Sequence, residues 1–352
     1  MAYTFDFPLN RNKIKGNIIF LSRIPSSTIN RFLNFFINPL RIPKKYDVYH
    51  ITTQTLGRLS RFIHPSIITV HDIYPLKASL TEPTMYGDLE SLPYGNKLIS
   101  AAYHTFVRES IKSVKYADVI ITPSYYTKKE LISLLQINPH KIKVVPHGIR
   151  HDLFKPRDKT KIRKTLDLPL NKKIVLHIGS ENPRKNIPTL IKAFAKLQKD
   201  GNRNIILLRV GETRANTHKL ISAYHLDESI LEFGLRDQSD LCYLYNAADV
   251  LVFPSLYEGF GLPLIEAMAS GCPVIAADRT SLPEVLGDAG ILCDPLNSDE
   301  LADAMKRLLG DEELRQRCSR KGLKRAAMYS WERVVKETVQ IFKESAKLIE
   351  SS

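Results

Sequence analysis

The sequence contains little cysteine and little tryptophan: four Cys and one Trp occur among 352 residues. All four cysteines lie in the second half of the chain, mostly in apolar settings, and none stands at metal-ligand spacing from another. We therefore expect reduced, structural thiols, and neither a zinc site nor a disulfide scaffold. The four are Cys242, Cys272, Cys293 and Cys318.

Long apolar runs are also missing, since no stretch approaches the ~20 residues that a helix needs to span a bilayer. The start of the chain, Met1–Asp6, lacks the basic and then apolar order of a secretory signal. We expect a cytoplasmic protein, either free in solution or peripheral at the inner face of the cell membrane.

The length and the 43% hydrophobic content suit two packed cores and exclude global disorder. Positive charge is unevenly distributed. Residues 1–150 carry a net charge of +11 and residues 151–352 carry +3, out of +14 in total. The basic first half implies an acidic partner: anionic lipid, a phosphorylated acceptor or nucleic acid.

Short β-branched runs alternate with helical patterns along the whole chain, which predicts parallel sheets covered by helices on both faces. A charged, proline-containing stretch at 154–169 separates two such series. Residues 75–94 show little periodicity and are predicted to be a loop. Strands are expected at 17–21, 47–52, 66–70, 118–123, 143–146, 173–178, 204–210, 229–233, 249–253, 273–276 and 290–293, and the clearest helices of the first half at 97–115 and 126–136.

The most informative segment lies between the strand expected at 249–253 and a helix expected at 262–270. Gly259 and Gly261 allow the backbone of this turn to approach a ligand closely. The free amides at the start of the helix favour an anion. Because Glu258 and Glu266 flank this anion site, it suits a ligand with both phosphate and hydroxyl groups, such as a sugar nucleotide.

A second strand-to-helix turn, at 179–186, contains Arg184 and Lys185. Cations at such a turn can neutralise a nucleoside diphosphate as it leaves. The alternative is an ordinary solvated basic turn.

Taken in order, these motifs resemble the signature of the family 4 retaining glycosyltransferases. A plain doubly wound domain with one tight turn would not explain so many companion motifs in the right order. The matching segments are Gly179–Asn186, Phe233–Leu235, Glu258–Glu266, Leu282–Val285 and Ser330–Glu332, with weaker matches at Val70–Asp72 and Val145–Gly148.

The resemblance implies the GT-B architecture, in which two doubly wound Rossmann-like domains face each other across a cleft. We assign residues 1–160 to an acceptor-side domain and residues 161–330 to a domain that binds the nucleotide sugar. The family's chain end returns to the first domain, so residues 331–352 are expected to cross back as a helix.

The resemblance also assigns roles to the charged residues. Lys185 matches the family's phosphate-binding lysine, and Arg184 lies beside it. Glu266 matches the carboxylate that binds the ribose hydroxyls, and Glu258 the one near the transferred sugar. His71 is expected to face that sugar from the first domain, although a lone histidine at a strand end is often structural. Glu258 and His71 are the predicted catalytic residues.

Further contacts follow from the same resemblance. The backbone at Gly259, Phe260, Gly261 and Leu262 is expected to bind the donor, and Leu235 belongs to the turn that holds the nucleobase. Two serines complete the set: Ser180 stands where the family often has an arginine, and Ser124 is a candidate contact to acceptor or phosphate. His147 is expected to be structural.

The family commonly has a glycine-rich loop after its first strand, whereas residues 20–27 contain no glycine. The diphosphate contact from the first domain is therefore in doubt, with Ser26 or Ser27 as substitutes.

The activity expected is that of a retaining hexosyltransferase with a nucleotide-diphosphate sugar donor. GDP-mannose is favoured, with UDP-glucose and UDP-N-acetylglucosamine as alternatives, and the acceptor is a saccharide or a lipid-linked saccharide of cell-surface polysaccharide synthesis. No cofactor and no essential metal are expected. A nucleotide-sugar epimerase of similar fold is the main rival. A nucleic-acid-binding protein would explain the charge but not the glutamates, so no nucleic acid is expected.

An apolar stripe in the first half has helical spacing and basic neighbours. It is predicted to pack on the first sheet, while Phe35 and the basic residues face anionic lipid. The stripe consists of Ile29, Phe32, Leu33, Phe36 and Ile37, and the basic residues are Arg23, Arg31, Arg41, Lys44 and Lys45.

Overall fold

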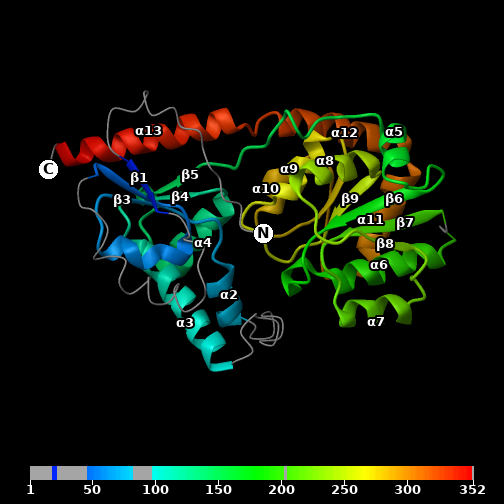
Figure 1. The fold of residues 1–352 in the computed structure, drawn as a ribbon, viewed down its shortest axis with the longest axis horizontal. Helices are drawn as coiled ribbons and strands as arrows, with labels where there is room; N and C mark the ends of the chain where they lie inside the picture. The colour runs from blue at the N-terminus through cyan, green and yellow to red at the C-terminus, as the bar shows by residue number, and fades with distance from the viewer. Residues whose placement is uncertain (1–17, 22–45, 82–96, 202–203, 351–352) are drawn as a thin grey trace.

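The structure is a computed structural model that describes residues 18–21, 46–81, 97–201 and 204–350. Two parallel sheets, each with its own helices, lie side by side (Figure 1). We call the parts built on them the first and second domains. The prediction of two doubly wound Rossmann-like domains is confirmed. The apolar stripe at 29–37, its basic neighbours, Ser26 and Ser27 lie outside the described residues.

The first domain is built on a five-stranded sheet in the order β1-β2-β3-β4-β5. Its strands are short and rich in isoleucine and valine, and their buried side chains form the core between sheet and helices. The strands are β1 (Ile18–Leu21), β2 (Val48–Ile51), β3 (Ser66–Thr69), β4 (Val119–Thr122) and β5 (Ile142–Val144). The helices are η2 (Gln54–Arg61), α2 (Tyr74–Thr81), α3 (Lys97–Ser113), η5 (Val114–Tyr116), α4 (Tyr125–Leu135) and η6 (Pro139–Lys141).

The second domain has a six-stranded sheet in the order β11-β10-β9-β6-β7-β8. The order reverses direction at β6 and β9, and ligands of such sheets bind outside the strand ends at that switch. The strands are β6 (Lys173–Ile178), β7 (Ile205–Val210), β8 (Ile230–Glu232), β9 (Val250–Phe253), β10 (Val274–Ala277) and β11 (Ile291–Cys293). The helices are α5 (Lys159–Thr165), η7 (Pro183–Lys185), α6 (Ile187–Lys199), α7 (Ala215–Ala223), α8 (Gln238–Ala247), α9 (Leu262–Ala269), α10 (Leu282–Leu286), α11 (Ser298–Gly310) and α12 (Glu312–Ala326).

The last helix, α13 (Trp331–Glu350), runs along the first sheet although it follows the second domain in the chain (Figure 1). Ile341 and Phe342 are buried against Val48 and Ile67 of the first sheet. This packing ties the two domains together at a point remote in sequence from the linker near residue 155.

The predicted strands are confirmed to within one or two residues at each end. The prediction of a loop from residue 75 was wrong at its start, where α2 forms. Asp72 accepts a hydrogen bond from the Tyr74 amide at 3.1 Å, and Pro75 occupies the first turn, so local capping starts a helix too short to show periodicity.

Candidate active site

The loop between β9 and α9 reaches the first domain through its glycines. A Cβ atom at Gly259 would lie 2.0 Å from the His71 carbonyl oxygen, so only glycine fits this approach. Gly261 is the N-cap of α9 with φ 107°, a left-handed conformation that glycine adopts without strain. Leu262 then opens the helix, with Pro263 in its first turn.

Glu258 is buried and carries two ion pairs. Its carboxylate lies 2.6 Å from Lys185 Nζ and 3.2 Å from Arg184 Nη1. Burial alone would raise the pKa of Glu258, but Lys185 and Arg184 outweigh burial and lower that pKa, so the group is ionised at neutral pH.

The two cations are placed by a tight turn after β6. Asn182 caps the backbone amide of Arg184, and Asn186 follows Lys185 in a left-handed conformation with φ 57°. The Asn186 side chain donates to the carbonyl groups of Pro254 and Pro295 at 3.1 and 2.6 Å. The turn is thereby fixed to the strand that leads into the Glu258 loop.

Glu266 is buried one turn inside α9, where Tyr245 of α8 donates a hydrogen bond to its carboxylate at 2.7 Å. Burial raises the pKa of Glu266 to about 7, and this single hydrogen bond offsets burial only in part. Glu258 and Glu266, at the two ends of one motif, therefore differ in charge near neutral pH.

His71 lies at the end of β3, against the Glu258 loop. Its Nε2 is 3.2 Å from the Thr52 carbonyl oxygen, and its ring stacks on His147 at 5.4 Å. His147 in turn contacts the ring of Phe260 at 5.2 Å. Burial lowers the pKa of His71 and takes that of His147 to about 3, so both are neutral. No pattern in the sequence signals this contact, which joins His147, predicted to be structural, to the loop between β9 and α9.

The remaining predicted residues lie at neighbouring strand ends. Ser180 and Leu235 are exposed in the turns after β6 and β8, and Leu235 is 60% exposed. Ser124 is buried, and its hydroxyl accepts the Thr127 amide at 3.0 Å as the N-cap of α4. The hydroxyl therefore has a structural role as a helix cap, and its contact to acceptor or phosphate stays a prediction.

An ion pair that was not predicted from the sequence connects the turn after β6 to β7. Arg209 of β7 is fully buried and binds the carboxylate of Glu181, which also accepts a hydrogen bond from Thr217 at 2.8 Å. Breaking a buried pair is costly, so Glu181 is fixed in this role and holds the Ser180 turn against β7.

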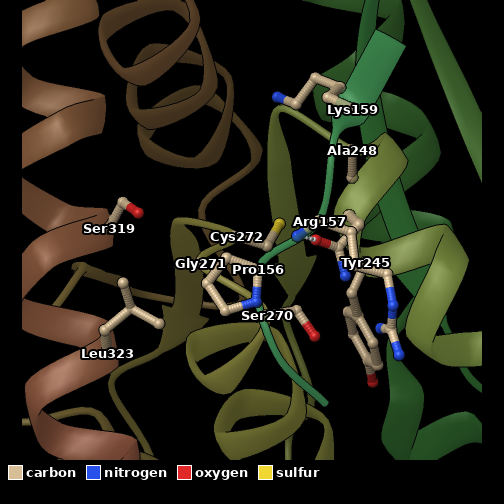
Figure 2. A pocket seen from close by; sticks show the side chains of 11 residues that line it. Pro156, Arg157, Lys159, Tyr245, Ala248, Ser270, Gly271, Cys272, Ser319 and Leu323 are labelled. Atoms are coloured by element: carbon tan, nitrogen blue, oxygen red, sulfur yellow. Dashed lines mark hydrogen bonds between the residues drawn. The ribbon is translucent and has the colours of Figure 1, made fainter. Parts of the chain in front are cut away.

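A separate pocket of about 180 Å³ lies at the C-terminal end of α9 (Figure 2). It is lined by the linker at Pro156 and Arg157, by the end of α9 at Ser270 and by Leu323 of α12. None of the predicted donor-binding residues lines it, although it is lined by Tyr245, whose hydroxyl donates to Glu266.

Two further features are absent from the described residues. No group of three or more His, Cys, Asp or Glu side chains in this part of the chain is placed to hold a metal ion. Nor is any described helix both long enough and apolar enough to cross a membrane.

Two family models match the chain in succession. "Glycosyltransferase Family 4" matches residues 6–153, and "Glycosyl transferases group 1" matches residues 158–325. Among curated relatives, the O-antigen chain mannosyltransferase B of Escherichia coli is 32% identical over 259 residues, covering 67% of this chain. The chain spans only 62% of that relative's length. The MMP alpha-(1->4)-mannosyltransferase of Mycolicibacterium hassiacum is 28% identical over 309 residues, covering 85% of this chain and 71% of the relative.

Solved structures share the fold. Sucrose-phosphate synthase from Thermosynechococcus elongatus superposes with a TM-score of 0.73 at 25% identity, covering 94% of this chain and 82% of that one. Anabaena HepE in complex with UDP and glucose superposes with a TM-score of 0.70 at 21% identity, covering 94% of this chain and 84% of that one.

Proposed function

The chain belongs to the glycosyltransferases of group 1 and family 4, and from this premise we propose that it is a retaining hexosyltransferase. It moves a sugar from a nucleotide-diphosphate donor to a saccharide or lipid-linked acceptor. The observation that carries the proposal is the contact of Lys185 and Arg184 with Glu258, at the sheet edge where nucleotides bind.

The diphosphate would be held by these two cations and by the first amides of α9. Cations and helix-start amides stabilise the negative charge that grows on the leaving phosphate as the glycosidic bond breaks. A bound diphosphate would compete with Glu258 for Lys185 and Arg184, which frees the Glu258 carboxylate for the sugar hydroxyls. Because the chain supplies its own cations, a divalent metal is dispensable in this proposal.

Glu266 would accept hydrogen bonds from the ribose hydroxyls in its ionised form. Its pKa near 7 gives the reason for expecting tighter donor binding as the pH rises through neutrality.

Same-face attack accounts best for retention. The acceptor oxygen forms the new bond on the face from which the phosphate leaves, and its proton passes to the leaving phosphate oxygen. A nucleophile for a covalent intermediate would have to sit on the far face of the sugar. Glu258 belongs to the phosphate-side loop, and its two ion pairs favour the ionised, hydroxyl-binding role. His71, neutral and beside Gly259, would contact the sugar from the first domain.

GDP-mannose is the proposed donor, because the relatives from E. coli and M. hassiacum are both named as mannosyltransferases. The O-antigen relative supports a role in cell-surface polysaccharide synthesis. The net charge of +11 on residues 1–150 supports peripheral contact with the anionic inner face of the cell membrane, close to a lipid-linked acceptor.

A donor screen tests the proposal. The protein is incubated with GDP-mannose, UDP-glucose or UDP-N-acetylglucosamine, with and without saccharide and polyprenyl-linked acceptors. Release of nucleoside diphosphate is measured, and the variant Glu258→Gln is assayed in parallel. Acceptor-dependent GDP release from GDP-mannose is expected. Release of UDP alone would mean that a UDP-sugar and not GDP-mannose is the donor. Conversion of a nucleotide sugar in the absence of an acceptor would favour the epimerase. No release from any donor would contradict transferase activity.

A further inference from the structure

Tyr257, the residue before Glu258, crosses from the second domain into the first. Its side chain is 3% exposed, and its hydroxyl donates a hydrogen bond to Glu130 Oε2 of α4 at 2.5 Å. The same hydroxyl accepts the backbone amide of Ile73 at 3.4 Å. The loop that carries Glu258 is therefore anchored, through a phenol, in the other domain.

The anchor is a partly buried polar network. Lys77 Nζ lies 2.8 Å from Glu130 Oε1 and 2.8 Å from the Tyr126 hydroxyl, which itself donates to Glu130 at 2.8 Å. The pKa of Lys77 is raised because Glu130 and Tyr126 outweigh the effect of burial. The Tyr74 ring packs on the Tyr257 ring at 5.4 Å. Tyr257 and Glu130 are buried, and a hydrogen bond between buried groups that satisfy each other favours a single arrangement of the two.

Arg184 connects Tyr257 and Tyr74 to Glu258. Its Nη1 donates to the Tyr257 carbonyl at 3.2 Å and lies at the same distance from the Glu258 carboxylate. Its guanidinium also lies over the Tyr74 ring, 5.5 Å from the ring centre. A shift of the Tyr257 backbone would therefore displace both Glu258 and one of its two cations.

The start of α4 makes a second contact between the domains. Glu284 of α10 accepts hydrogen bonds from the backbone amides of Tyr125 and Tyr126 at 3.1 and 3.2 Å. The first amides of a helix have no partner inside it, so these two depend on the other domain for protection. Their hydrogen exchange reports whether the domains are closed.

From this geometry we infer that Tyr257 is a positioning residue that couples domain closure to the placement of Glu258. The Tyr257 hydroxyl can bind the network of Glu130, Lys77 and Tyr126 only when the second domain lies against α4. Glu258 and Arg184 therefore take their positions as the domains close. The kinetic test of this inference rests on the proposed function, whereas the exchange test does not.

Two variants and one matched control test it. Tyr257→Phe removes the hydroxyl and keeps the ring, and Glu130→Gln removes the charge at the other end. Tyr116→Phe, on a half-exposed tyrosine of the first domain, is the control. With the best donor, kcat is expected to fall ~10-fold or more in both variants, as for a lost hydrogen bond to a charged group. Nucleoside diphosphate affinity should fall less than kcat, because Lys185 belongs to the second domain and Arg184 is the phosphate-binding cation that donates to the Tyr257 carbonyl.

Hydrogen exchange of the segment 124–127, followed by mass spectrometry without ligand, should be faster in both variants and unchanged in Tyr116→Phe. The double variant should lose no more kcat than the more affected single one. If Tyr257→Phe lowers the unfolding temperature so far that it cannot be assayed, the kcat and the hydrogen exchange of Glu130→Gln test the inference. Wild-type kcat together with wild-type exchange would overturn the inference. If no donor is turned over by any form, the proposed function fails, and exchange alone decides whether Tyr257 closes the domains.

Discussion

Replacing Glu266 by Gln is predicted to make the protein more resistant to unfolding at alkaline pH. The pKa of this carboxyl is about 7 in the folded protein, against an ordinary value of 4.5. A carboxyl whose folded pKa is raised contributes stability below its unfolded pKa, and that contribution is lost as the pH rises through the folded pKa. Each unit of difference corresponds to about 1.4 kcal/mol, so the wild type should lose about 2–3 kcal/mol relative to Glu266→Gln between pH 5 and pH 8.

Urea denaturation followed by circular dichroism at pH 5, 6, 7 and 8 measures this difference. Glu313→Gln, on an exposed glutamate of α12, is the matched control and should follow the wild type throughout. Parallel stability curves for wild type and Glu266→Gln would contradict a raised pKa of Glu266, because they would mean that this carboxyl titrates alike in the folded and unfolded chains.

Three further predictions concern turnover and the membrane. Glu258→Gln should lower turnover ~10–150-fold, the effect of one lost contact to a charged group, without unfolding the protein; wild-type turnover would remove Glu258 from the site. Gly259→Ala should lower turnover strongly, because its Cβ would meet the His71 carbonyl at 2.0 Å, whereas Gly310→Ala, where a Cβ meets nothing within 4 Å, should match the wild type in the same assay. In liposome flotation at low salt, the protein should bind vesicles in proportion to their anionic lipid, and changing Arg31, Arg41, Lys44 and Lys45 to Gln should weaken binding; equal recovery with neutral vesicles would exclude the membrane.

The strands and the glycine turn could be predicted from the sequence, because each carries its own local signal, whereas the roles given to the charged residues beside that turn stay predictions. Gly259 and Gly261 mark a turn, and Arg184 and Lys185 follow a strand that is recognisable by itself. In parallel sheets the strand ends meet at one edge, so these separate signals converge in space.

The contacts between the domains could not be predicted in the same way. Tyr257 and Glu130 are 127 residues apart, and neither belongs to a pattern that specifies a partner. The same holds for His147 between His71 and Phe260. Ser124 shows the opposite difficulty, since a serine after a strand suits both ligand binding and an N-cap, and the structure uses its hydroxyl as a cap.

In the proposed function, Lys185 and Arg184 hold the diphosphate of the donor. Titration calorimetry with GDP and UDP, in the presence of EDTA, tests it on the wild type, Lys185→Ala and Arg184→Ala. Lys192→Ala, on α6 of the same domain, is the control. We expect the wild type to bind one of the two nucleotides in EDTA and Lys185→Ala to bind it ~10–150-fold more weakly, with an unchanged affinity for the control. Equal affinities for the wild type, Lys185→Ala and Arg184→Ala, or binding that requires added Mg²⁺ or Mn²⁺, would contradict it.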